Sequence, residues 1–138
     1  MQGNYTWDEL NSRFDELQAE YSNIISERVI LGESVEGRDI WAFKVSDTPE
    51  EDEEESEVLF TALTHAREPV GMMNLIYFVQ LLAEEYGTDP ELTYLVNERE
   101  IWFLPVVNPD GCVYNESIQP NGGGMHRKNR LNTNCGDG

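Results

Sequence analysis

Cysteine is scarce in this sequence, whose 138 residues include only Cys112 and Cys135. The absence of a C-x-x-C pair argues against a zinc ribbon and against a thioredoxin-type redox site. Both cysteines lie in a C-terminal third rich in glycine and asparagine. They either form a disulfide that pins a long loop or remain as two buried thiols, and the sequence leaves both alternatives open.

Long apolar runs are also missing. In the longest expected helix, residues 75–79 are apolar but Gln80 follows at once, which excludes a membrane span of about 20 residues. Residues 1–4 lack the charged and apolar pattern of a signal peptide. We therefore expect either a cytosolic protein or one whose signal and upstream sequence have been removed.

Basic residues are few: 9 lysines and arginines face 27 acidic residues, for a net charge of −18. Such a chain repels nucleic acid and anionic membranes, so we expect neither as a partner. The acidic segment 47–57 contains Pro49 and is typical of a solvated loop, although a cation site there is an alternative. The acidity extends well beyond this segment.

Apolar periodicity predicts most of the secondary structure. A capping box at Thr6–Glu9 begins a helix with one apolar face, and residues 29–31 and 40–45 form two antiparallel strands around a turn. The remaining expected elements are a strand at 58–63 covered on both faces, helices at 69–86 and 89–97, and a strand at 101–107. This order predicts an α/β fold with a mixed sheet.

The segment after Gly111 has a different character. Residues 115–138 show no periodicity and are expected to lack secondary structure. A stretch of that length indicates a functional loop or the edge of a larger unit. Asn115-Glu116-Ser117 also fits an N-glycosylation acceptor.

His65 and Glu68 form the most informative short pattern, H-x-x-E, between the apolar run 58–63 and a helix that Pro69 can start. Zinc binds imidazole nitrogen and carboxylate oxygen at about 2.0–2.2 Å. A spacing of three across a strand-to-helix junction brings two such ligands to the same side. By itself the pattern is weak, and a helix-capping Glu68 beside a hydrogen-bonded His65 is the alternative.

Four stretches, in order, together resemble the zinc metallocarboxypeptidases of the carboxypeptidase A type. They are Gly32-x-Ser34-x-Glu36-Gly37-Arg38, Thr64-His65-Ala66-Arg67-Glu68, Asn108-Pro109-Asp110-Gly111 and Arg127-Lys128-Asn129-Arg130. Order and spacing match across nearly the whole chain. The resemblance implies that residues 1–138 are the N-terminal portion of a catalytic domain. Its fold would be α/β, a mixed β-sheet flanked by helices that forms a truncated part of a three-layer, phosphorylase/hydrolase-like domain.

The resemblance also implies an activity: removal of C-terminal residues from peptides and proteins by attack of a zinc-activated water. His65 and Glu68 would be two of three Zn²⁺ ligands, and Arg127 would bind substrate and stabilise the oxyanion. Arg67 would line the substrate groove, with a salt bridge as the alternative. A surface position is the alternative for Arg127. Residues 108–111 would form a turn that shapes the site and would take no part in the chemistry. The implied location is secreted or periplasmic.

The sequence also departs from the family pattern. The third zinc ligand, the general base and the residues that choose the substrate's C-terminal side chain are expected after Gly138, and His126 is a poor candidate for third ligand. We therefore expect the isolated chain to be inactive, and a truncated sheet with open edges to self-associate. A deacylase of N-acyl amino acids and a non-catalytic peptide- or metal-binding module are the alternatives. The 108–111 and 127–130 stretches favour the peptidase over the deacylase.

Overall fold

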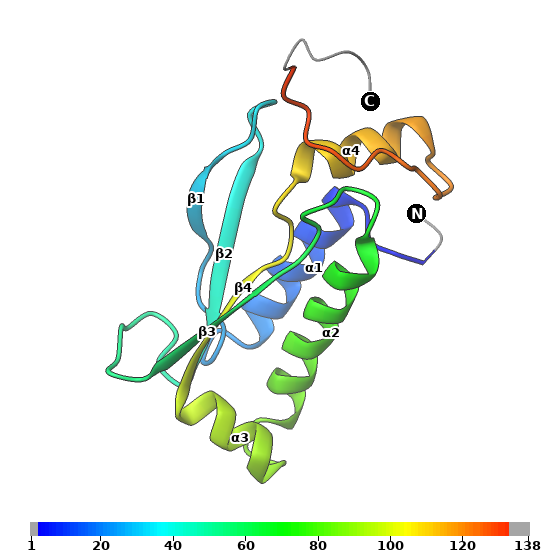
Figure 1. Ribbon diagram of the computed structural model, residues 1–138. Helices are drawn as coiled ribbons and strands as arrows, with labels where there is room; N and C mark the ends of the chain where they lie inside the picture. Colours follow the sequence, from blue (N-terminus) through cyan, green and yellow to red (C-terminus); the bar gives the residue numbers. More distant parts are fainter. Residues whose placement is uncertain (1–2, 133–138) are drawn as a thin grey trace.

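The fold is a four-stranded mixed sheet with helices, shown in a computed structural model that describes residues 3–132 (Figure 1). The strands are β1 (Val29–Glu33), β2 (Asp39–Val45), β3 (Ser56–Thr61) and β4 (Arg99–Leu104). They lie in the order β1-β2-β4-β3; β1 and β4 are antiparallel to β2, and β3 is parallel to β4. The predicted mixed α/β sheet is therefore confirmed.

The helices are α1 (Trp7–Glu20), α2 (Pro69–Glu85), α3 (Pro90–Asn97) and α4 (Pro109–Ile118). The predicted capping box begins α1: the Glu9 amide donates to the Thr6 hydroxyl, and the Thr6 amide donates to the Glu9 carboxylate. Gly87 follows α2 with a φ of +81°, a conformation that glycine adopts without strain. The first three helices thus begin and end close to the predicted residues.

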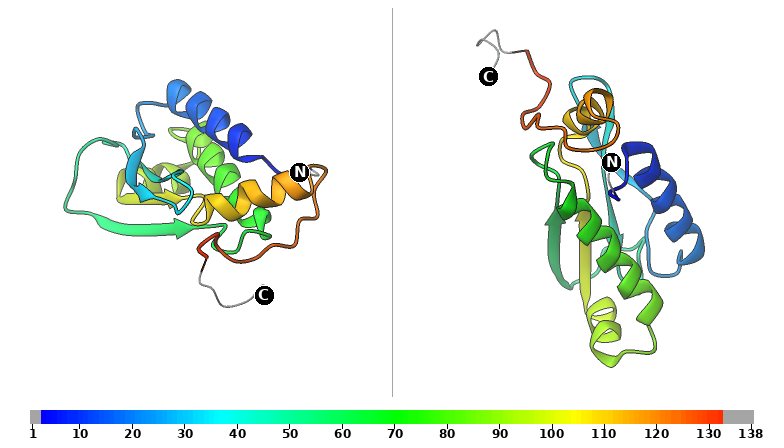
Figure 2. Two further views of the ribbon diagram at one scale, coloured as in Figure 1. Left: turned by 90° about the horizontal axis from the view of Figure 1, so that it is seen from above. Right: turned by 90° about the vertical axis from the view of Figure 1, so that its right-hand side faces the viewer.

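Helices α1 and α2 lie on one face of the sheet (Figure 2), and a core of aromatic side chains joins them to it. Phe43 and Phe103 are register partners on β2 and β4, and their rings stack with centroids 5.4 Å apart. Phe14 of α1 packs on Phe43 at 4.6 Å, and Phe78 of α2 packs on Phe103 at 6.0 Å. Because Phe14 and Phe78 contact the Phe43–Phe103 pair from the same side of the sheet, the two helices form a single layer over it.

Strand β3 is exposed along its whole length, so the prediction of a strand covered on both faces is wrong. Within residues 3–132 it pairs only with β4 and forms an edge of the sheet. Val58, Leu59 and Phe60 remain 39%, 60% and 36% exposed. A continuous apolar run indicates what a strand can bury, but the elements that pack against it decide what it does bury.

Helix α4 lies where the sequence indicated a turn and an irregular segment, so both expectations are wrong up to Ile118. Asn108 caps the helix, because its side-chain oxygen accepts a hydrogen bond from the Gly111 amide at 3.0 Å. The helix buries polar residues such as Asp110 and Asn115, which hides its period in the sequence. Asn115 is only 2% exposed, so the glycosylation reading is also wrong.

The acidic segment 47–57 is tied to the sheet by a buried ion pair between Lys44 and Glu100, 2.5 Å apart. The same Glu100 oxygen accepts the Glu53 amide, and the Lys44 ammonium donates to the Glu51 carbonyl. Burial alone would raise the pKa of Glu100, but these bonds lower it. Oxygens of the exposed Asp52 and Glu57 and of the buried Glu100 lie within 4.8 Å of one another. Exposed acidic groups are common without an ion, so the cation site stays a prediction.

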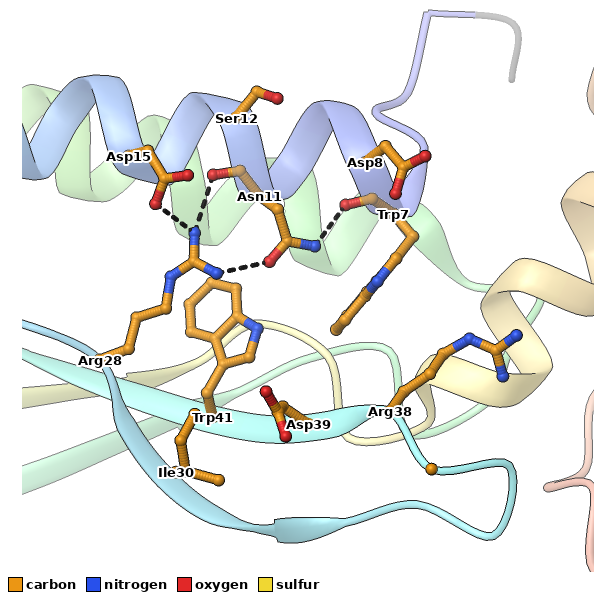
Figure 3. A pocket seen from close by; sticks show the side chains of 11 residues that line it. Trp7, Asp8, Asn11, Ser12, Asp15, Arg28, Ile30, Arg38, Asp39 and Trp41 are labelled. Atoms are coloured by element: carbon orange, nitrogen blue, oxygen red, sulfur yellow. Dashed lines mark hydrogen bonds and ion pairs between the residues drawn. The ribbon is translucent and has the colours of Figure 1, made fainter.

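Arg28 joins α1 to the β1–β2 hairpin in a pocket of about 640 Å³ (Figure 3). Its guanidinium lies over the Trp41 ring at 4.5 Å and donates to Asn11 and to Asp15. A guanidinium that stacks on an aromatic ring and binds polar groups at its edge fixes the helix in two directions. Arg28, Asn11 and Asp15 therefore serve the fold.

A buried carboxylate, that of Asp110 in α4, holds the turn between β1 and β2. It accepts hydrogen bonds from the Ser34 hydroxyl at 2.6 Å, the Glu36 amide at 2.9 Å and the Arg38 guanidinium at 2.7 Å. Burial alone would raise the pKa of Asp110, but these three bonds lower it below its ordinary value. The Gly32–Arg38 stretch and the Asn108–Gly111 stretch are thus one polar unit.

We predict that Asp110→Asn lowers the free energy of unfolding by about 2–4 kcal/mol at pH 7, because it removes the charge that satisfies a partly buried arginine. A lowered pKa gives stability that is complete above the ordinary value of 3.8 and is lost as the pH falls through the folded value. The difference between wild type and variant should therefore be constant from pH 7 to pH 5 and shrink at pH 3. Urea unfolding measures it, with the exposed Asp39→Asn as control; a difference that grows on acidification would contradict the prediction.

The exposed edge of β3 predicts self-association of the 138-residue chain. Leu59→Lys should raise the monomer fraction, because a lysine on an edge strand opposes pairing with a second strand. Val70→Lys, at an equally exposed apolar position on a helix, is the matched control and should have little effect. Light scattering across a concentration series measures both; a wild-type chain that stays monomeric at high concentration would refute the prediction.

Candidate metal and substrate site

His65 and Glu68 lie in the connection from β3 to α2, and their side chains meet. The His65 Nδ1 and Glu68 Oε2 atoms are 2.9 Å apart, and the Glu68 amide donates to the His65 carbonyl at 3.0 Å to close the turn. The side chains are 37% and 56% exposed, so a solute can reach both donor atoms. The predicted pair is therefore assembled and accessible.

The backbone turns sharply just before this pair, at Leu63. Leu63 has a φ of +51°, and within residues 3–132 it is the only residue other than glycine with a positive φ. Its side chain is buried, and its carbonyl accepts the Asn108 amide at 3.2 Å. A non-glycine residue in this conformation costs free energy and persists only where surrounding bonds hold it. The bond from Asn108 therefore helps to hold the turn that leads from β3 to His65.

The position of the pair follows from the parallel pairing of β3 with β4. The segments that leave the carboxyl ends of these strands meet at the same end of the sheet, beside α4 (Figure 1). A pocket of about 570 Å³ opens there, and His65, Asn108, Asp110, Arg127 and Lys128 are among the residues that line it. Open α/β sheets bind ligands at this end.

The two donor atoms fit a zinc ion in type and approximately in spacing. Zinc bonds of about 2.0–2.2 Å at a tetrahedral angle place two donors about 3.4 Å apart, so Nδ1 and Oε2 would separate slightly to share one ion. A catalytic site takes a third protein ligand, but no group of three metal-binding side chains within residues 3–132 includes His65. His126 packs its ring on Tyr114, with centroids 4.8 Å apart, and is not brought to the pair.

Arg127 lies directly beside the pair, with its Nη2 atom 3.3 Å from His65 Nδ1. It approaches from a loop 62 residues further along the chain, so the fold joins two of the motifs singled out in the sequence. Arg67, in contrast, is exposed, does not line the pocket and makes no ion pair within the described part of the chain. Its place in a substrate groove stays a prediction.

Residues 108–111, to which the family resemblance gave a role in shaping the site, hold the walls of the pocket together through contacts that the sequence did not indicate. Asn108 donates from its Nδ2 to the Lys128 carbonyl at 3.0 Å, and Asp110 fixes the turn on the opposite wall. Gly111 lies so close to the loop before α2 that a Cβ on it would come within 2.5 Å of the Ala66 Cβ. The sequence did carry a signal for the helix that holds these residues, because the Asn-Pro pair of the 108–111 stretch is typical of a capped helix start.

Cys112 is fully buried in α4, and its sulfur lies 3.3 Å from a Glu116 carboxylate oxygen. Burial in apolar surroundings, together with that carboxylate, raises the pKa of the Cys112 thiol well above its ordinary value. This thiol is therefore inert toward solvent and plays no part in the site. The predicted pairing involves Cys135, which lies outside the described residues.

Comparison with known proteins identifies relatives of the chain. The profile of the zinc carboxypeptidase family matches residues 10–137. Carboxypeptidase A2 of Rattus norvegicus is 35% identical over 129 residues, covering 91% of this chain and 28% of the relative. A zinc carboxypeptidase of Saccharothrix mutabilis subsp. capreolus is 45% identical over 84 residues, covering 61% of this chain and 19% of the relative.

The fold points the same way. The crystal structure of carboxypeptidase A from Helicoverpa armigera superimposes with a TM-score of 0.77 and 30% identity, covering 94% of this chain and 30% of that structure. The chain thus spans less than a third of the length of these relatives. Because the family profile covers nearly all of its residues and its helices and strands are arranged as in a solved carboxypeptidase, the chain belongs to the zinc carboxypeptidase family.

Proposed function

We propose that this chain supplies part of the active site of a zinc-dependent carboxypeptidase that removes C-terminal residues from peptides and proteins. One observation carries the proposal: His65 Nδ1 lies 2.9 Å from Glu68 Oε2 and 3.3 Å from Arg127 Nη2, and His65 and Arg127 line a pocket. Family membership adds to it, because the names of the relatives describe carboxypeptidases.

In this proposal His65 and Glu68 hold the zinc ion, and both supply ligand atoms of the kind that zinc prefers. Bound zinc would lower the pKa of a water molecule and polarise the scissile carbonyl. Glu68 brings a single negative charge to a divalent ion, so the local charge stays positive. That charge attracts the oxygen on which negative charge develops during hydrolysis.

Arg127 is proposed to bind the substrate carbonyl and to stabilise the same developing charge. A fixed guanidinium aimed at a developing oxyanion lowers the barrier more than a mobile one, because it needs no reorganisation during the reaction. Arg67, exposed between the two zinc ligands, is proposed to contact the substrate outside the pocket.

The site formed by these residues is incomplete by itself. Within residues 3–132, no third metal-binding side chain lies in a group with His65. No residue that lines the pocket is proposed as the general base. We infer that the isolated chain binds zinc weakly and does not hydrolyse peptides, since a water without a proton acceptor is a poor nucleophile.

Location stays a prediction. Among the described residues, no helix is both long and apolar enough to cross a membrane. Secretion or export to the periplasm is proposed from family membership alone.

The metal assignment predicts weak zinc binding by the 138-residue chain that depends on one histidine. His65→Ala should weaken zinc binding by about 10–100-fold or more. Loss of a residue that only supports a ligand already costs about that much, and this change removes a ligand itself. Isothermal titration with zinc measures the effect, and His126→Ala, the other histidine, is the matched control. Tight binding accompanied by peptidase turnover, or a larger effect of His126→Ala, would refute the assignment.

The role of Arg127 predicts a loss of turnover in the zinc-loaded full-length enzyme. Arg127→Ala should lower kcat by about 10²–10³-fold and leave zinc content unchanged, because the cation acts mainly on charge that develops in the transition state. Steady-state kinetics on a peptide with a free C-terminus measure the change. Arg13→Ala, on the surface of α1, serves as control; an equal effect of the two variants would exclude the proposed role.

A further inference from the structure

Asn115 is a buried polar residue that the proposed chemistry leaves unused. It lies in α4 and is only 2% exposed. Its Nδ2 donates to the Ala66 and His126 carbonyls, both at 2.8 Å, and its Oδ1 accepts the His126 amide at 3.0 Å. Both amide protons and one oxygen lone pair are thus committed to backbone atoms outside its own helix.

These bonds connect the two segments that carry the proposed site. Ala66 lies directly after His65, and His126 lies directly before Arg127. The Ala66 amide also donates to the Arg127 carbonyl at 3.1 Å, so the two segments are joined at adjacent residues. The Asn115 amide bridges them from a rigid helix.

The loop is shaped to fit this side chain. A Cβ on Gly124 would lie 2.5 Å from the Asn115 Oδ1 and 2.8 Å from its Cβ, closer than atoms approach in proteins. Gly124 does not have a positive φ, so its backbone conformation does not by itself require glycine. The close approach to Asn115 does.

We propose that Asn115 is a positioning residue that sets the place of Arg127 relative to the His65–Glu68 pair. The inference rests on the function proposed above. Arg127 is exposed and belongs to a loop without helix or strand, so its side chain needs an external reference to stay 3.3 Å from His65. A misplacement of about 1 Å at a reacting group costs about 10²-fold in rate. Asn115 supplies that reference through backbone bonds on either side of the contact.

The first experiment uses the 138-residue chain and needs no catalytic activity. Asn115→Ala removes the side chain that bridges the two segments. Gly124→Ala keeps Asn115 but places a methyl group against its side chain. Both variants should speed amide hydrogen exchange at Ala66 and His126 by about tenfold or more, because local opening becomes easier. Two-dimensional NMR reads the individual rates.

Two controls separate this effect from unfolding. The amide of Ser46, which donates to the Ile24 carbonyl in the core, should stay protected in every variant. Asn121→Ala, at an exposed asparagine of the same loop, should leave both test amides unchanged. Unchanged exchange at Ala66 and His126 in Asn115→Ala would overturn the proposal whatever the activity of the protein.

The second experiment uses the zinc-loaded full-length enzyme and a peptide with a free C-terminus. Asn115→Ala should lower kcat by about 10–100-fold with KM changed by less than about threefold and zinc content unchanged. On an Arg127→Ala background the same change should cost less than about threefold, because Asn115 acts through Arg127. A purely structural role would lower kcat equally on both backgrounds, and that result would overturn the proposal.

The two experiments also separate this inference from the function on which it rests. A wild-type enzyme without peptidase activity would refute the proposed function, while the exchange rates would still decide whether Asn115 holds the loop. An active enzyme with equal losses on both backgrounds would refute the positioning role alone.

Discussion

The Asp110 carboxylate is the interaction on which the architecture around the pocket depends. It binds a hydroxyl, an amide and a guanidinium from the turn between β1 and β2, although it belongs to α4. Arg38 then extends the network to Glu36, which also accepts from Arg130 in the last described loop. Hydrogen bonds from these two arginines lower the pKa of Glu36 and so favour its charged form. One buried charge thereby fixes three segments that the aromatic core does not reach.

The two ends of the molecule are held by different forces, and the difference suits what each end does. Phenylalanine rings in tilted and edge-on contact bind α1 and α2 to the sheet, and the burial of apolar surface that drives this packing is non-directional. Around the pocket, side chains such as Asn108 and Asn115 bind backbone atoms of other segments. Hydrogen bonds fix distance and angle, and they tolerate the water that a substrate site must admit. Leu63, with its strained backbone, belongs to both parts: its side chain lies in the core and its carbonyl binds Asn108.

How far the sequence predicts this structure depends on how each part is stabilised. Helix α1 and strands β2 and β4 bury apolar residues, so their apolar patterns were enough to predict them. Strand β1 was also predicted from its apolar residues, although all five of its residues are exposed. The exposure of β3 depends on what else packs there, and no property of residues 58–63 encodes it. Helix α4 and the Asp110 and Asn115 bridges rest on polar contacts over long sequence separations, which leave no period to read. The contact between His65 and Arg127 was expected only from the family resemblance of the motifs.

Two charged residues that line the pocket differ in sign from the net charge of the chain. The chain as a whole is strongly acidic, with a net charge of −18, which suggests affinity for cations. Arg127 and Lys128 nevertheless line the pocket, and neither forms an ion pair with a carboxylate in the described part of the chain. Of the acidic residues that line the pocket, Asp110 is paired with Arg38, and Glu33 is the other; Glu68 lies beside them, 2.9 Å from His65. Local charges act at short range while distant ones are screened within about 8–10 Å in saline solution. Within the described residues, the pocket therefore carries two cations without a carboxylate partner, Arg127 and Lys128, although the chain as a whole is strongly acidic.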